Sequence, residues 1–207
     1  MKVEMWADIM CPWCYIGKAR LDRALAAVDR GHEVETVWRS FELRPQQPRV
    51  PGATLGEMMR RRFSLSTDRT SDLFERIRAL GAEEGLDIRL DGLRPVNSFD
   101  AQRLIHRAAG SGLAGRLADR LFRGYFTEHL NVADHAVLLR LATDAGLDPA
   151  TVRKVLGSDA HAADVRRDER QAGERGVTSV PAVFVEEVPV GEGVPTVAEL
   201  TDALKAG

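Results

Sequence analysis

A chain of 207 residues that is 44% hydrophobic and 29% charged has the composition of a soluble globular protein with a sizeable core. Its formal net charge of −2 gives no reason to expect nucleic acid or a membrane surface as a partner. No apolar run approaches the roughly 20 residues that a membrane span needs, and Lys2 and Glu4 argue against a signal peptide. We therefore expect a cytoplasmic protein built as one large domain or as a domain with an insertion.

The first predicted elements form a β-α-β unit. Apolar side chains alternate over residues 2–8, which predicts a strand. They recur at helical spacing over residues 21–28, and Gly31 is predicted to end this helix. A second strand is predicted at residues 34–41, and the β-α-β order makes the two strands parallel.

The only two cysteines lie between the first strand and this helix, in the sequence Cys-Pro-Trp-Cys. A disulfide between Cys11 and Cys14 would close a very short loop and would add little to folding stability. We expect Cys11 at the helix N-cap and Pro12 at the first helical position, where its missing N–H is not needed. The positive helix N-terminus favours a thiolate on Cys11, and Cys14 is close enough to resolve a mixed disulfide. The spacing and its context therefore indicate redox chemistry.

A break rich in proline follows the second strand. Residues 44–52 contain three prolines, which excludes regular structure and predicts a hinge. Beyond it the apolar spacing is helical, so residues 49–169 are predicted to form an inserted helical subdomain. The clearest apolar stripes lie at residues 73–80, 99–105, 113–125 and 137–141.

Short polar signals mark some helix ends within this insertion. Asp148 and Pro149 predict an N-cap followed by a proline at the first helical position. Asn97 and Ser98 are plausible cap residues before another helix. The cluster Arg60-Arg61-Arg62 is predicted to lie on a solvated helix rather than in a binding site.

The β pattern returns near the C-terminus. Apolar runs at residues 183–185 and 188–190 predict a hairpin, although its turn lacks glycine. Thr196 and Glu199 have the spacing of a capping box at the start of a last helix. The resulting order predicts an α/β fold in which residues 1–48 and 170–207 form one domain around a shared sheet.

Several motifs resemble a known family. They are residues 8–18 around the cysteines, Phe-Glu-Leu at 41–43, Asn-Ser-Phe-Asp-Ala at 97–101 and Gly-Val-Thr-Ser-Val-Pro at 176–181. Together they resemble the FrnE-type branch of the DsbA family, and the order of elements resembles a thioredoxin-like fold with the large helical insertion of DsbA-like proteins. The sequence at residues 186–193 departs from the family pattern, which leaves substrate preference near the hairpin open.

The resemblance implies a thiol-disulfide oxidoreductase. Cys11 would attack the substrate, Cys14 would resolve the mixed disulfide, and Pro181 would be a cis-proline facing them. Proline makes a cis bond accessible, and the exposed backbone at Val180 could then pair with a substrate peptide. The alternative for Pro181 is a trans proline at a strand start. The implied substrates are protein or low-molecular-weight thiols and disulfides, with glutathione as a plausible co-substrate.

The residues around the cysteines suggest further roles. Trp13 is predicted to offer an apolar contact to substrate, the alternative being core packing, and together with Val180 and Pro181 it forms the predicted substrate-binding set. Because tryptophan carries no charge, we expect a moderate couple, between about −270 and −120 mV. Asp8 or Glu4 could move the proton of Cys14, the alternative being a solvated charge for each. Lys18 is expected to be a surface lysine.

Other classes of function remain as alternatives. A zinc site is disfavoured because two thiolates supply half of a tetrahedral set, and we expect no metal cofactor. The histidines have no ligand spacing near the cysteines; they are His32, His106, His129, His135 and His161. A kappa-class glutathione-dependent isomerase or transferase would typically hold a serine in place of Cys11 and lack the second cysteine. A redox-regulated chaperone is the non-enzymatic alternative. The direction of the reaction and the oligomeric state stay open.

Overall fold

A mixed four-stranded sheet in the order β2-β1-β3-β4 organises the described part of the chain. The structure is a computed structural model that describes residues 1–28 and 34–207. The helix end predicted at Gly31 and the histidine His32 lie outside the described residues. The strands are β1 (Lys2–Ala7), β2 (Glu35–Ser40), β3 (Ala182–Val185) and β4 (Val188–Pro189).

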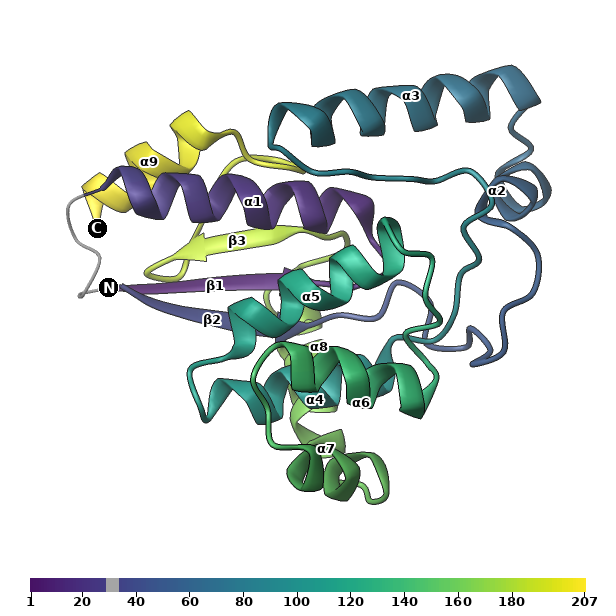
Figure 1. Cartoon of the computed structure of the whole chain (residues 1–207). Helices are drawn as coiled ribbons and strands as arrows, with labels where there is room; N and C mark the ends of the chain where they lie inside the picture. The colour runs from purple at the N-terminus through teal and green to yellow at the C-terminus, as the bar shows by residue number, and fades with distance from the viewer. Residues whose placement is uncertain (29–33) are drawn as a thin grey trace.

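The two ends of the chain build this sheet together, as predicted (Figure 1). β1 pairs in parallel with β2, so that Lys2 lies opposite Glu35. On its other side β1 pairs in antiparallel fashion with β3, where Val3 lies opposite Val185. The α/β thioredoxin-like arrangement is therefore confirmed, with its helical insertion between β2 and β3.

The β3–β4 hairpin has a two-residue turn made of Glu186 and Glu187. Both residues have positive φ, 46° and 71°, which is the conformation that a type I′ turn requires. That conformation usually favours glycine or asparagine, so the turn type could not be predicted from two glutamates. The predicted hairpin is confirmed.

Helices cover both faces of the sheet (Figure 1). α1 (Pro12–Ala27) and α9 (Val197–Ala206) pack together on one face, and α8 (Ala162–Glu174) and α4 (Phe99–Ala109) pack against β2. The remaining helices of the insertion are α2 (Leu55–Phe63), α3 (Thr67–Glu83), α5 (Ala114–Phe126), α6 (His135–Asp144) and α7 (Pro149–Leu156). No helix among the described residues is both long and apolar enough to cross a membrane.

Several helix ends follow the predicted capping chemistry. Asp148 accepts from the Thr151 N–H with Pro149 beginning α7, and both bonds of the Thr196–Glu199 capping box are present. Ser98 is the N-cap of α4 but makes no capping bond, whereas Asn97 accepts from the Phe99 N–H at 2.9 Å. The predicted boundary between residues 169 and 170 falls inside α8, and the division into two domains stays a prediction.

Of the two alternatives for Glu4, the solvated charge is wrong, because helices cover this face of the sheet as well (Figure 1). Glu4 is 2% exposed because α8 lies over it, and its carboxylate accepts from Arg39 Nε at 2.8 Å and Arg175 Nη1 at 3.0 Å. Arg39 also donates to Asp168 of α8 at 3.0 Å. Burial opposes ionisation of Glu4, but hydrogen bonds from Arg39 and Lys2 outweigh it and lower its pKa. This buried network joins α8 to the sheet.

The expectation of a surface position for Lys18 is also wrong. Lys18 is 6% exposed, and its ammonium group lies 2.7 Å from carboxylate oxygens of both Asp22 and Asp119. Asp119 belongs to α5, so the ion pair links α1 to the helical insertion. The sequence around Lys18 does not predict Asp119 as its partner, because Asp119 is distant along the chain.

Candidate active site

The Cys-Pro-Trp-Cys motif caps the helix that follows the first strand. Cys11 is the N-cap of α1 in an extended conformation, and Pro12 is its first residue, as predicted. The Cys11 N–H donates to the Asp8 carbonyl at 3.0 Å, and the Cys14 N–H donates to the Cys11 carbonyl at 3.1 Å. These bonds place both sulfurs at the positive end of the helix.

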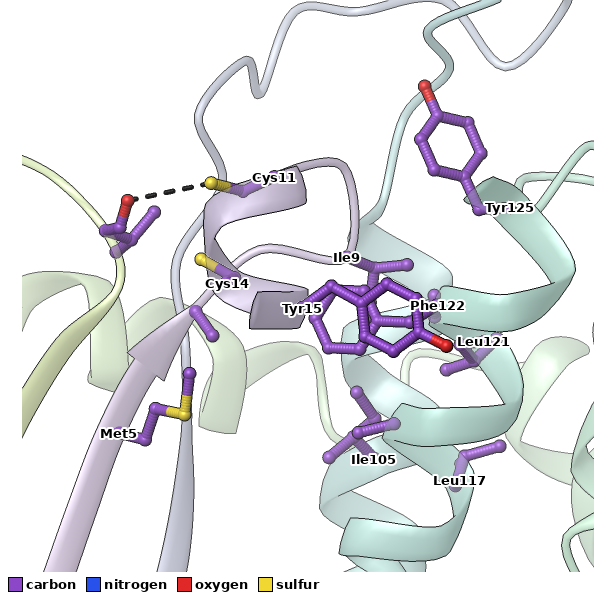
Figure 2. Packing of buried hydrophobic residues seen from close by; sticks show 14 of the residues in the cluster. Met5, Ile9, Cys11, Cys14, Tyr15, Ile105, Leu117, Leu121, Phe122 and Tyr125 are labelled. Carbon is purple, nitrogen blue, oxygen red and sulfur yellow. Dashed lines mark hydrogen bonds between the residues drawn. The ribbon is translucent and has the colours of Figure 1, made fainter. Parts of the chain in front are cut away.

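Both cysteines are free thiols, and both are buried. Cys11 is 3% exposed and Cys14 is fully buried. The Cys11 thiol donates to the carbonyl oxygen of Val180 at 3.6 Å, as Figure 2 shows. The Val180–Pro181 peptide bond is cis, which bears out the expected geometry of Pro181 over the trans alternative. The substrate-binding roles of Val180 and Pro181 stay predictions.

A glycine lets the Pro181 loop approach the helix. A Cβ atom on Gly17 would lie only 3.0 Å from Pro181 Cγ and 3.3 Å from Pro181 Cβ. Because these ring atoms cannot rotate away, only glycine fits there without a shift of the backbone. Gly17 therefore positions the loop against the cysteines, a role that no local sequence pattern reveals.

The two thiols differ in their surroundings. Burial raises the pKa of Cys14 well above its ordinary value, and the hydrogen bond and charge of neighbouring Cys11 raise it further. Cys14 therefore holds its proton at neutral pH and must lose it before it can act as a nucleophile. Asp8 is the carboxylate whose charge reaches Cys14, whereas Glu4 is engaged by the arginines of the far face.

Of the two alternatives for Asp8, the solvated charge is wrong, since Asp8 is 1% exposed. Its Oδ1 accepts from the Met10 N–H at 3.1 Å and its Oδ2 from the Leu43 N–H at 2.8 Å. Burial raises the pKa of Asp8, although these bonds and one from Ser98 oppose the change. A buried carboxyl with a raised pKa is suited to exchange a proton with a nearby thiol.

Two motifs that the resemblance singled out meet at this carboxyl. Leu43 and Ser98, one from each motif, both bond to Asp8. Beside them, Asn97 donates to Glu42 at 3.3 Å and Arg166 donates to Glu42 at 2.5 Å. Burial raises the pKa of Glu42 to about 7 despite its bond from Arg166. Sequence reasoning noted these motifs but missed their role around Asp8.

A pocket of about 370 Å³ opens beside the motif, and Cys11 and Trp13 line one side of it. Trp13 is half-buried, packs against the hydrophobic core and also faces this pocket. The contact with the core agrees with the second alternative considered for Trp13, and its contact with substrate stays a prediction. Among residues 1–28 and 34–207, no three histidine, cysteine, aspartate or glutamate side chains gather as a metal site.

Two features together define the class of protein. One is the thioredoxin-like sheet, and the other is the Cys-X-X-Cys pair at the start of the helix after its first strand. This combination is that of a thiol-disulfide oxidoreductase. Residues 2–205 match the DSBA-like thioredoxin domain family, so the chain belongs to that family.

Solved structures and a curated relative agree with this assignment. The crystal structure of a probable DsbA oxidoreductase from Streptomyces coelicolor is similar over the whole chain and 89% of its own, with a TM-score of 0.93 and 37% identity. The uncharacterized protein YwbO of Bacillus subtilis (strain 168) is 26% identical over 188 residues, which are 88% of this chain and 86% of YwbO. Cytosolic disulfide reductase DsbM from Pseudomonas aeruginosa, in a structure with GSH, has a TM-score of 0.73 at 20% identity and matches all of this chain and 98% of its own. The likeness to DsbM shows the fold alone.

Proposed function

We propose that this protein exchanges disulfides with protein and low-molecular-weight thiol substrates through its Cys-Pro-Trp-Cys pair. The observation that carries the proposal is the place of Cys11 Sγ, at a helix N-cap and 3.6 Å from the Val180 carbonyl beside Pro181. A substrate sulfur that reaches Cys11 would lie next to this backbone edge, with which an extended peptide can pair.

The reaction has two exchange steps. The Cys11 thiolate attacks one sulfur of the substrate disulfide, so the substrate S–S bond breaks and the leaving thiolate takes a proton from water. The Cys14 thiolate then attacks Cys11, which releases the second substrate thiolate and forms the Cys11–Cys14 disulfide. The substrate gains two electrons and the enzyme loses them. Two molecules of a small thiol such as glutathione then restore the reduced pair and leave as their own disulfide. Oxidation of a dithiol substrate is the same sequence in reverse.

Asp8 supplies the proton acceptor that the second step needs in this proposal. Cys14 is fully buried and has no solvent of its own, while the Asp8 carboxyl is buried beside it. A buried carboxyl with a raised pKa accepts and returns a proton more readily than an ordinary one. Cys14 then passes its proton to Asp8 as it attacks the mixed disulfide at Cys11.

We also propose a cytoplasmic location, a place in the FrnE-type branch, and glutathione as co-substrate. Support for the branch comes from the motifs at residues 8–18, 41–43, 97–101 and 176–181. Support for the location and for the co-substrate comes from the similar fold of DsbM, which is described as a cytosolic disulfide reductase and was solved with GSH. A measured redox potential against the cytosolic glutathione poise decides the direction.

Trapping of the mixed disulfide tests the proposed function. Cys14→Ala removes the resolving thiol, so substrates are expected to stay attached to Cys11 and to be released by dithiothreitol. The matched control is the double variant Cys11→Ala with Cys14→Ala, which has the same cavity behind the motif but no attacking thiol. An absence of any Cys11-dependent adduct, together with unchanged cellular function in Cys11→Ala, excludes the oxidoreductase.

Two assays separate this function from the alternatives. Reduction of insulin or another disulfide protein requires both thiols, whereas a glutathione-dependent isomerase or transferase acts on small molecules without the second one. A chaperone keeps its holdase activity in Cys11→Ser. Retention of both cysteines in the N-cap geometry favours the redox reading.

A further inference from the structure

We propose that the pocket beside Cys11 binds an apolar side chain of a protein substrate, and that Arg44 binds an acidic side chain next to it. The preferred substrate is then an extended protein segment whose cysteine has an apolar and an acidic neighbour. This inference rests on the proposed function, because the bound cysteine is the one that Cys11 attacks.

The walls of the pocket are built for an apolar group. Residues of the insertion line this pocket together with Cys11 and Trp13, and α2 lies at the end of the molecule where α1 begins (Figure 1). Both α2 and α3 face the pocket with apolar side chains, which are Leu55, Met58, Met59, Leu73, Phe74 and Ile77. Methionine side chains are flexible and polarisable, so they adapt to apolar groups of different shape.

The rim of the pocket favours a longer chain over a compact small molecule. Leu43 is 44% exposed and Phe63 is 52% exposed, and both line the pocket. These two belong to the few large apolar side chains that the described residues expose to solvent. Exposed apolar surface that continues from a pocket marks an interaction site, and a peptide that extends past the pocket would cover it.

The guanidinium of Arg44 inside the pocket forms no ion pair with a carboxylate of the described residues. Arg44 is half-buried, and its guanidinium donates to the sulfur of Met58, which is a weak acceptor. No carboxylate within residues 1–28 and 34–207 forms an ion pair with Arg44 or with nearby Arg62. Buried Arg103, by contrast, lies 2.7 Å from Asp100. Burial lowers the pKa of Arg44, and the charge of Arg62 lowers it further, so an added carboxylate would stabilise this site.

Asp8 also lines the pocket, and its charge partly offsets the lowering of the Arg44 pKa, but the two side chains form no ion pair. The two oxygens of Asp8 already accept from the N–H groups of Met10 and Leu43. Arg44 therefore keeps its capacity for a bidentate bond with an acidic side chain. The apolar walls and this charge together define the substrate class.

Rates of exchange with matched peptide disulfides test the inference. Each peptide carries one cysteine joined to the same chromophoric thiol, and the residues that flank the cysteine are leucine and aspartate, leucine and asparagine, or serine and aspartate. With the reduced full-length protein we expect the first peptide to react about tenfold faster than each of the others, equivalent to about 1.4 kcal/mol. The preference for aspartate over asparagine should shrink as salt concentration rises.

Variants locate the preference in Arg44. In Arg44→Gln the ratio of rates for the aspartate and asparagine peptides is expected to fall to about one. Arg61→Gln is the matched control, since Arg61 is exposed on the same helix as Arg62 but does not line the pocket, and it should keep the ratio. If Arg44→Gln does not fold, the salt dependence in the unmodified protein still decides whether a charge is involved.

Three outcomes overturn the inference. They are equal rates for all peptides, a ratio unchanged in Arg44→Gln, and a peptide-free aromatic carboxylate disulfide that shows the same Arg44-dependent preference. The last result would assign the pocket to small molecules. A failure of the proposed function looks different, because then no peptide releases its chromophore in a Cys11-dependent manner.

Discussion

Replacement of Gly17 by alanine tests whether the helix and the Pro181 loop are held together by close packing. The new Cβ would lie 3.0 and 3.3 Å from two atoms of the Pro181 ring, where ordinary contacts begin at 3.4 Å. Overpacking of this kind costs about 1–3 kcal/mol. Alanine in a helix recovers about 1 kcal/mol relative to glycine, so the variant should be less stable by about 0–2 kcal/mol.

A second glycine provides the control for the helix effect. Gly173 lies in α8, and a Cβ there would meet nothing within 4 Å. Gly173→Ala should therefore stabilise the protein by up to about 1 kcal/mol. Urea unfolding of both variants separates the two contributions, because the difference between them isolates the clash with Pro181.

The same variant should also react more slowly. A shift of the Pro181 loop moves the Val180 carbonyl away from Cys11, and misplacement by 1 Å costs about 100-fold in rate, so a smaller shift predicts roughly tenfold slower exchange. Equal stability changes in Gly17→Ala and Gly173→Ala, or exchange in Gly17→Ala at the unmodified rate, would refute the packing argument.

Two further predictions concern buried carboxyls. Asp8→Asn should slow release of product from the mixed disulfide roughly 100-fold at pH 7, because asparagine cannot accept the Cys14 proton. The difference in release rate between Asp8→Asn and the unmodified protein should narrow as pH rises, because hydroxide then deprotonates Cys14. Equal release rates of the two proteins at pH 7 in rapid-mixing experiments, or a rate difference that does not change with pH, contradict this role. For Glu42, whose pKa rises from 4.5 to about 7 on folding, the folded state binds the proton more tightly, so its contribution to stability falls as pH rises between these values. Glu42→Gln should thus gain unfolding free energy relative to the unmodified protein between pH 4.5 and 7 in urea titrations, and a pH-independent difference argues against it.

Much of the fold could be predicted from short sequence signals at the individual strands and helices. The strand before Cys11, the proline at the start of α1 and the capping box of α9 each depend on residues close together in sequence. Such signals act through backbone geometry and hydrogen bonds within one element, so they can be read without knowing the neighbours. The cysteine pair was predictable for the same reason.

The surroundings of the site depended on distant contacts. Glu4 is buried under α8, and Lys18 is buried where it pairs with Asp119. The residues next to Glu4 and Lys18 in sequence do not predict either contact. The helix α8 itself was not predicted as a separate element, since few of its residues are apolar. A charged side chain looks the same in sequence whether it meets water or a buried partner.

By itself, then, the sequence determined that a redox-active Cys11–Cys14 pair begins a helix in a thioredoxin-like fold, because short-range spacing carries that information. Only the tertiary structure decided what surrounds the pair. It brings Val180 to Cys11, buries Asp8 beside Cys14 and folds the insertion into a pocket that contains Arg44. These contacts join segments far apart in the chain, and their energies come from burial and charge that exist only once the segments have packed.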